Sequence, residues 1–160
     1  MERILVVDDE DKIRAIIRKY GEFEGYEITE AHDGMEAVEI CRKEDFDLII
    51  LDLGLPDMDG LEMAEHAKRI WPETRIIFLT GYQDFEYVRK ALRLNSDDYL
   101  LKPVSDEKLT EVIGNVISKL DSLWMERFDL RYRKAAETEK TSINPGKAVY
   151  FLFIAYEADQ

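Results

Sequence analysis

Short apolar runs alternate with amphipathic segments along most of this chain, and the alternation restricts the fold more than any other feature. Five runs have the length and composition of strands: residues 4–7, 26–31, 46–53, 75–80 and 98–101. Segments with helical spacing of apolar side chains follow them, over 10–23, after Asp33, after Asp59, over 83–94 and after Ser105. This order predicts an α/β fold, in which helices cover both faces of a parallel sheet.

Residues that commonly cap helices stand at the predicted helix ends. Asp33, Asp59 and Ser105 are each placed to accept a hydrogen bond from the first turn of a helix, and Gly25 is placed to end the first helix. We expect that first helix to pack inward through four apolar side chains: Ile13, Ile16, Ile17 and Tyr20.

Composition limits the classes of protein to which the chain can belong. Apolar residues make up 46% of the 160, which is enough for one core with some chain left over. The net charge of -13 argues against nucleic-acid binding by this chain alone, because such proteins usually present a basic face. No apolar run approaches the ~18 residues that span a bilayer, and the first residues lack the basic start of a signal peptide. With a single cysteine, Cys41, in an apolar helical stretch, we expect a buried thiol, no membrane contact and a cytoplasmic location.

Polar side chains stand at or just beyond the predicted carboxyl ends of four strands. Asp8 and Asp9 follow the first strand, Asp52 lies at the end of the third, and Thr80 and Lys102 belong to the last two. The carboxyl ends of parallel strands share one edge, and open α/β sheets bind their ligands there. Taken singly, such an Asp is also explained as a helix cap and such a Thr as packing. The convergence of all five favours a functional site.

The three carboxylates of that set suggest what the site binds. Asp8, Asp9 and Asp52 would repel one another if they met at the sheet edge. A bound divalent cation would remove the repulsion, and one carboxylate could then also take part in chemistry. The residues alone predict no more than this acidic cluster.

The chain resembles the receiver domain of bacterial two-component response regulators over about residues 1–120. The resemblance is carried by the order and spacing of five segments: VDD (7–9), LD (51–52), LPDMDG (55–60), LTG (79–81) and YLLKP (99–103). Residues 81–87 and 98–104 further resemble receivers that are joined to AraC-type DNA-binding outputs. The resemblance implies a flavodoxin-like, doubly wound sheet of five strands in the order 2-1-3-4-5.

The resemblance also implies a phosphoacceptor and its metal. Asp52 would accept a phosphoryl group and form an acyl phosphate. Asp9, Asp52 and the backbone carbonyl of Gly54 would hold Mg²⁺ (or Mn²⁺), and Asp8 would act through a bound water. Gly54 departs from many relatives, which carry a side chain there, and Leu55 stands where Met is common.

The resemblance also implies which residues would bind the phosphoryl group and which would change the surface. Lys102 would pair with a phosphoryl oxygen, aimed inward by a cis bond to Pro103, and Thr80 would donate its hydroxyl to another. Gly81 would leave room for the phosphodonor. Once Thr80 moves towards the phosphoryl group, Tyr99 could rotate inward and switch the contacts of the neighbouring surface.

The resemblance implies a signalling protein rather than an enzyme. A sensor histidine kinase would be the phosphate source, and the output would be transcription. Two alternatives stay open: a stand-alone receiver or scaffold, and an Mg²⁺-dependent phosphatase with an aspartate nucleophile. The phosphatase chemistry requires a second Asp two residues after the first, and position 54 is Gly.

The last forty residues fall outside the resemblance. We expect residues 1–120 to be the receiver and 121–160 to be a helical extension with an apolar tail that begins or joins an output region. Leucines and a valine recur every seventh residue, at Leu109, Val116, Leu123 and Leu130, which is typical of a coiled coil. The alternate seam of the helix turns polar at Arg127 and Lys134, which argues against a coiled coil along its whole length. We expect any homodimer to form through the 83–120 face or through the C-terminal helix.

Overall fold

The computed structural model describes residues 1–81, 86, 89–90, 93 and 97–138. The chain divides into two compact units, Met1–Ile117 and Ser118–Gln160, of which the first carries the sheet. The predicted helix over 83–94 lies largely outside the described residues, as does the apolar segment 149–156.

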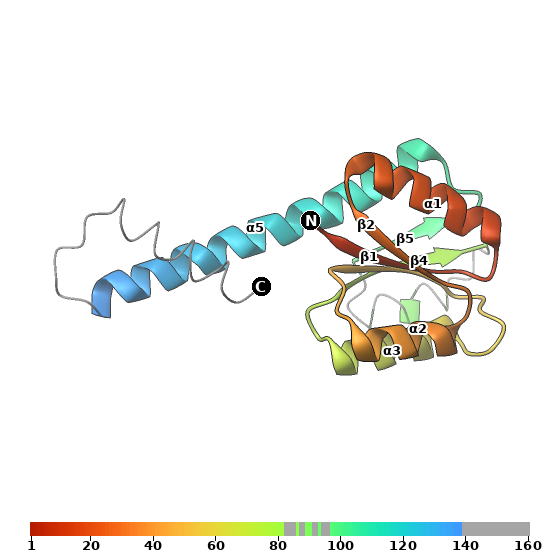
Figure 1. The fold of residues 1–160 in the computed structure, drawn as a ribbon, viewed down its shortest axis with the longest axis horizontal. Coiled ribbons are helices and arrows are strands. Elements are labelled where there is room, and N and C mark those ends of the chain that lie inside the picture. Colours follow the sequence, from red (N-terminus) through yellow and green to blue (C-terminus); the bar gives the residue numbers. More distant parts are fainter. Residues whose placement is uncertain (82–85, 87–88, 91–92, 94–96, 139–160) are drawn as a thin grey trace. The chain divides into compact units, whose positions relative to one another are not determined.

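A parallel sheet of five strands forms the centre of the first unit (Figure 1). Its strands are β1 (Arg3–Val7), β2 (Glu27–Ala31), β3 (Leu48–Asp52), β4 (Arg75–Thr80) and β5 (Asp98–Leu101). Their order is β2-β1-β3-β4-β5, which confirms the predicted flavodoxin-like topology. All five residues of β3, the central strand, are buried, as a strand covered on both faces should be.

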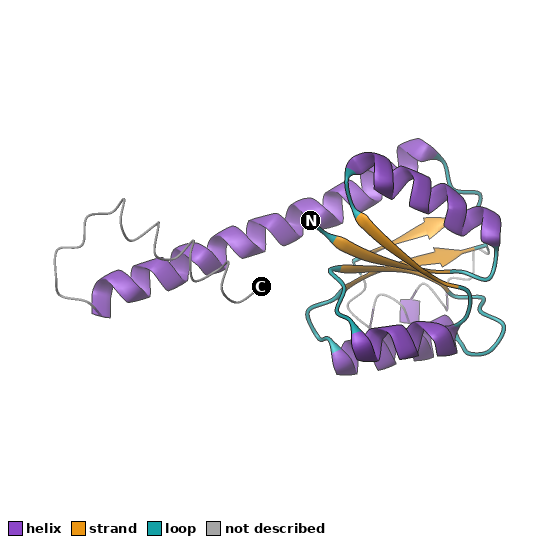
Figure 2. Ribbon diagram, viewed as in Figure 1, coloured by secondary structure: helices purple, strands orange, loops and turns teal. Residues whose placement is uncertain are grey.

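Helices cover both faces of this sheet (Figure 2). The helices with described bounds are α1 (Asp11–Glu24), α2 (Gly34–Lys43), α3 (Gly60–Ile70) and α5 (Asp106–Thr138). Within the first unit, α1 and the first turns of α5 lie on one face, and α2 and α3 lie on the other. Alternate residues of the strands therefore face two separate apolar layers. One layer contains Leu5, Leu51 and Phe78 of the sheet with Met63 and Ala64 of α3.

The predicted caps are present. The side chains of Asp33 and Asp59 accept hydrogen bonds from Glu36 N (2.8 Å) and Leu61 N (2.9 Å). Ser105 Oγ accepts one from Lys108 N at 3.2 Å. Gly25 ends α1 with φ 87°, a left-handed conformation that glycine adopts without strain.

The predicted inward face of α1 is wrong at one position. Ile17 is buried, but Ile16 is 42% exposed. The helix packs through Ile17 and Gly21, which are one turn apart, and Ile16 is rotated away from that line. Gly21 allows the close approach, because a Cβ there would lie 2.4 Å from Cδ1 of Ile28 on β2.

The single cysteine belongs to the core. Cys41 is buried, as predicted, and its pKa is raised to about 11 by burial.

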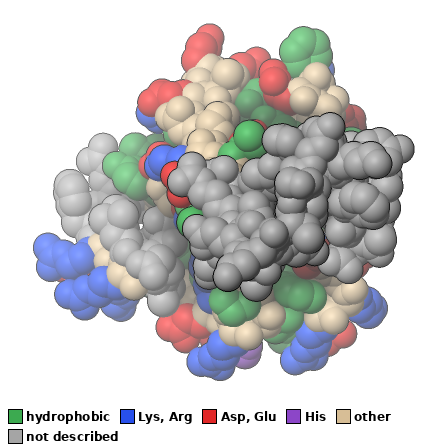
Figure 3. Space-filling view, turned by 90° about the vertical axis from the view of Figure 1, so that its left-hand side faces the viewer, with side chains coloured by type: hydrophobic (Ala, Val, Ile, Leu, Met, Phe, Trp, Pro, Cys, Tyr) green, Lys and Arg blue, Asp and Glu red, His purple; other side chains and the backbone are tan. Residues whose placement is uncertain are grey.

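The residues of α5 that recur every seventh position differ in exposure, since Leu109 and Val116 are buried whereas Leu123 and Leu130 are exposed. Acidic and basic side chains are both spread over the surface that Figure 3 shows. None of the described helices combines the length and apolar character that crossing a membrane requires.

Candidate functional site

The three aspartates predicted to meet at the sheet edge do so. Asp8 and Asp9 follow β1 directly, and Asp52 is the last residue of β3, the neighbouring strand. The register pairs Val7 with Leu51, so the next residues of both strands leave the sheet at one level. One carboxylate oxygen from each aspartate lies within 4.8 Å of the other two. This spacing lets a single small cation contact all three.

The aspartates differ in exposure. Asp8 is fully buried and Asp52 is nearly so, whereas Asp9 is exposed. Burial raises the pKa of Asp8, and the negative charge of Asp52 adds to the rise, against Lys102 and the Glu10 amide, which lower it. The cluster therefore has two carboxylates held out of water and one at its solvent side.

Lys102 compensates the charge of the cluster. Its Nζ lies 2.8 Å from Asp8 Oδ2, 3.0 Å from Glu10 Oε1 and 3.2 Å from Asp52 Oδ2. Burial alone would lower the pKa of this ammonium, but its contacts with Asp8 and Glu10 and the charge of Asp52 outweigh burial and raise it. The Lys102–Pro103 bond is cis, in agreement with the resemblance. Lys102 is thus charged and faces the aspartates.

Thr80 and its neighbours line the adjoining strand end. Thr80 ends β4 and is buried, and its carbonyl accepts a hydrogen bond from Lys102 N at 2.9 Å. Gly81, the next residue, is exposed. Tyr99 lies on β5 and is 40% exposed.

The loop after β3 is held against the site by several contacts. Gly54 N donates to Asp52 Oδ1 at 3.1 Å, which turns the chain back over the aspartate. Further along, the carboxylate of Asp57 accepts from Gly34 N (2.9 Å) and Met35 N (2.8 Å) at the start of α2. The loop after β3 is therefore hydrogen-bonded, through Asp57, to the N-terminal end of α2.

The residues present suit a divalent cation. Oδ2 of Asp8 is buried and, among the described residues, accepts no hydrogen bond of good geometry, so its contact with Lys102 is best described as an ion pair. Such an atom is available to a metal-bound water or to the ion itself. Carboxylate and carbonyl oxygens are the ligands that Mg²⁺ prefers in proteins. The donor set therefore fits a hard divalent cation.

Comparison with known proteins identifies the architecture that carries this site. The response regulator receiver domain family matches residues 4–114. The chain belongs to the response regulator receiver family. Domains of this family act with sensor histidine kinases in two-component systems, and they normally serve as phosphoacceptors.

Individual receiver proteins are similar over most of the chain. The transcriptional regulatory protein SrrA of Staphylococcus aureus is 33% identical over 141 residues, which are 88% of this chain and 58% of SrrA. The chain thus spans little more than half the length of that relative. The receiver domain of AraT, a response regulator from Geobacillus stearothermophilus, is 39% identical with a TM-score of 0.71, covering 77% of this chain and 98% of its own. A CheY-like receiver from Methanospirillum hungatei JF-1 is 36% identical with a TM-score of 0.71, over 79% and 98%.

Sequence reasoning about this receiver missed three residues that the structure brings to the site. Glu10 contacts Lys102, Asp57 fastens the loop after β3, and Arg14 contacts the backbone of Asp8. Glu10 directly follows the two predicted aspartates, Asp8 and Asp9, and this position is the only feature of the sequence that could have indicated a role for it at the site. The Asp57 contact joins residues more than twenty positions apart, and the Arg14 contact depends on how its side chain turns back to the carbonyl of Asp8; neither geometry is revealed by the sequence pattern.

Proposed function

We propose that Asp52 is the phosphoacceptor of this receiver. One of its carboxylate oxygens would attack the phosphorus atom of a phosphodonor and form the new P–O bond of an acyl phosphate. The bond from phosphorus to the donor would break, and the donor would leave with that electron pair. The observation that supports this proposal most directly is the position of Asp52, which is nearly buried, lies beside two other aspartates and is 3.2 Å from the ammonium of Lys102.

A divalent cation, Mg²⁺ or Mn²⁺, would be held by Asp9, Asp52 and the carbonyl of Gly54, with Asp8 acting through a water. When bound, the ion supplies positive charge between the carboxylates and the phosphoryl oxygens, which would otherwise repel. The acidic cluster within 4.8 Å supports this part of the proposal.

Two more side chains would bind the phosphoryl oxygens. Lys102 would move from its contacts with Asp8 and Glu10 to a phosphoryl oxygen, since both partners are charged and the ammonium already lies beside Asp52. Thr80, at the end of the neighbouring strand, would donate its hydroxyl to another, and Gly81 would leave the approach open. Pro103 would support the turn that carries Lys102.

The output would follow from a change of surface. Phosphorylation adds about one to two negative charges and strong acceptors to the site. Movement of Thr80 towards them would let Tyr99 rotate inward from its half-exposed position and alter the surface around β5. We propose residues 1–120 as the phosphoacceptor domain, and 121–160 as the connection to an output region that regulates transcription.

The phosphate source would be a sensor histidine kinase, with transfer from its phosphohistidine to Asp52. An Mg²⁺-dependent phosphatase is disfavoured by Gly54, which provides no second carboxylate for acid–base chemistry. A scaffold without phosphotransfer is disfavoured by the intact set of three aspartates and Lys102.

Incubation with acetyl phosphate and MgCl₂ tests the proposal. Intact-mass spectrometry should show one added phosphoryl group on the wild type and on Asp45→Ala, a control at the exposed start of the segment leading into β3. It should show none on Asp52→Ala. Phosphate release over many turnovers would indicate a phosphatase instead, and no modification of the wild type would indicate a scaffold.

A further inference from the structure

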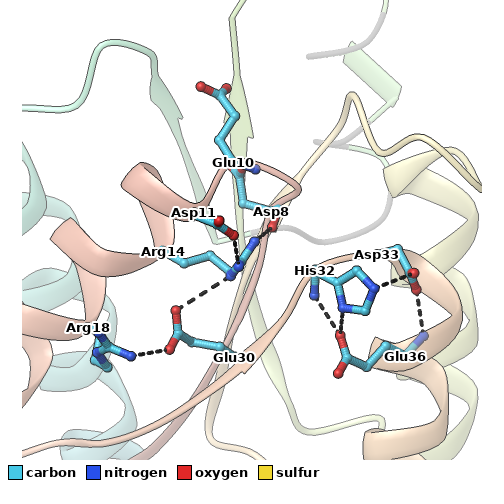
Figure 4. A network of polar contacts seen from close by, with 9 residues as sticks. All are labelled: Asp8, Glu10, Asp11, Arg14, Arg18, Glu30, His32, Asp33 and Glu36. Carbon is cyan, nitrogen blue, oxygen red and sulfur yellow. Dashed lines mark hydrogen bonds and ion pairs between the residues drawn. The ribbon is translucent and has the colours of Figure 1, made fainter.

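Arg14 occupies a position that the helix itself does not favour. It lies in the first turns of α1, where the helix dipole favours negative rather than positive side chains. Its side chain is nevertheless only 13% exposed, and it extends back towards Asp8, in the loop that follows β1 (Figure 4). A long cationic side chain placed against the dipole and held out of water requires specific partners.

Two partners of Arg14 lie on other segments, the loop that carries Asp8 and Asp9 and the strand β2. Nη1 of Arg14 donates to the backbone carbonyl of Asp8 at 2.6 Å. Nε lies 3.5 Å from Oε1 of Glu30 on β2, and Nη2 also contacts Asp11. Glu30 is held in turn by Arg18, whose Nη1 lies 2.6 Å from Oε2. Arg14 is therefore fixed from both sides, by the strand and by its own helix.

The carbonyl that Arg14 contacts belongs to the peptide that joins Asp8 to Asp9. The rest of Asp8 is fixed as well, since its N–H donates to Ala31 O at 3.2 Å and its Oδ1 accepts from Glu10 N at 2.8 Å. Arg14 holds the carbonyl oxygen of Asp8, and with it the plane of the peptide from which Asp9 extends. Asp9 is exposed, so little packing otherwise directs its carboxylate.

We infer that Arg14 is a positioning residue for the divalent cation, acting through the Asp8–Asp9 peptide, with Glu30 holding the guanidinium in place. This inference rests on the proposed function, because it concerns the same cation site. Arg14 itself touches neither the ion nor the phosphoryl group. Removal of residues that orient metal ligands typically weakens metal affinity by about 10–100-fold.

Charge and positioning predict opposite effects, which makes the inference testable. Loss of a cation beside an acidic site should, by Coulomb's law alone, leave Mg²⁺ binding tighter. Loss of a positioning contact should leave it weaker. Arg14→Met removes both the charge and the hydrogen bonds. Arg14→Lys keeps the charge but loses the planar fork that reaches Asp8 and Glu30 together.

The experiment is calorimetric titration of MgCl₂ into the whole chain, at constant ionic strength and below the unfolding transition of every variant. We expect Arg14→Met to bind Mg²⁺ about tenfold or more weakly than the wild type, and Arg14→Lys to fall between them. Arg18→Met, which removes an equal charge from the outer side of Glu30, should bind as tightly as the wild type or slightly more tightly.

Unchanged or tighter binding by Arg14→Met would overturn the inference. If that variant does not fold, Arg14→Lys decides, and wild-type affinity in it overturns the inference as well. Equal weakening by Arg18→Met would also count against it, because the effect would then belong to the ion-pair network and not to the contact with Asp8. A wild type that does not bind Mg²⁺ would instead contradict the proposed function itself.

Discussion

Gly60 allows the backbone to pass close to Asp52, the proposed phosphoacceptor. A Cβ at this position would lie 2.4 Å from the carbonyl oxygen of Asp52 and 2.7 Å from Cα of Leu53. Both are backbone atoms, so no side-chain rotation could relieve the clash. The first residue of α3 and the last residue of β3 are therefore packed directly against each other, and the start of the helix sets the position of Asp52.

Substitution of Gly60 by Ala should destabilise the protein. The added methyl must displace backbone at the end of β3, and overpacking of this kind destabilises by about 1–3 kcal/mol. Urea unfolding would measure the change. Gly114, in α5, is the matched control: nothing lies within 4 Å of its Cβ position, so Gly114→Ala should stabilise by about 0.5–1 kcal/mol through helix propensity. Equal stability of Gly60→Ala and the wild type would show that the approach is not tight.

Lys102 offsets much of the negative charge at the acidic site. Three carboxylates, those of Asp8, Glu10 and Asp52, lie within 3.2 Å of its Nζ. Its pKa is raised by them, so the ammonium keeps its proton throughout the ordinary pH range. In the proposed site, a cation held by Asp9 and Asp52 would compete with Lys102 for the Asp52 carboxylate and free the ammonium for an incoming phosphoryl group.

Asp57 joins the loop after β3 to helix α2. Its carboxylate accepts hydrogen bonds from the N–H groups of Gly34 and Met35, which the helix cannot satisfy itself. Burial would raise the pKa of Asp57, but these backbone hydrogen bonds outweigh burial and lower it. The loop that contains Gly54 is therefore fastened to a helix by a charge-assisted contact.

That contact should make stability depend on pH in a defined direction. Because the pKa of Asp57 is lower in the folded state, its contribution is fully present above the unfolded-state value of about 3.9 and is lost as the pH falls through the lower folded value. Asp57→Asn should destabilise by about 1 kcal/mol at pH 7, a modest figure because the residue is exposed.

The difference in unfolding free energy between Asp57→Asn and the wild type should shrink below about pH 4. Urea unfolding at pH 7 and at pH 3 would measure it. Asp121→Asn, at an exposed site on α5, serves as the control for a general charge effect. A difference that stays constant between the two pH values would show that the Asp57 carboxylate does not stabilise α2 through its charge.

The elements that sequence could predict are those specified by nearby residues. The caps of α2 and α3 depend on Asp33 and Asp59, each within three residues of its donor, and both were predicted. The bonds from Asp57 to α2 join residues more than twenty positions apart, and no periodicity encodes them. The exposure of Ile16 was missed for a related reason: the inward side of α1 is selected by its fit to Ile28, not by the apolar pattern alone.

The sheet as a whole brings distant residues into one site. Strand order and parallel direction place the ends of β1, β3, β4 and β5 at one edge, so Asp8, Asp52, Thr80 and Lys102 come from positions spread over more than ninety residues. This convergence could be predicted, because it follows from the alternation of strands and helices. The contacts within the site could not, since they depend on side-chain positions that the pattern leaves open.

The net charge of -13 opposes the approach of an anionic phosphodonor to the site. Thirty-five acidic residues oppose 22 lysines and arginines, so an anionic phosphodonor approaches a negative molecule. Local cations must offset that repulsion, and among the described residues Lys102 is the basic one that contacts Asp52, the proposed phosphoacceptor. A bound divalent cation would supply further positive charge at the site.

Mapping the phosphorylated residue with and without metal would show whether Asp52 is a metal-dependent phosphoacceptor. The full chain would be treated with acetyl phosphate in MgCl₂ or in EDTA, any acyl phosphate would be trapped by borohydride reduction, and the peptides would be identified by mass spectrometry. We expect modification at Asp52 alone, and only when Mg²⁺ is present. Modification of another residue, or equal modification of Asp52 in EDTA, would contradict it.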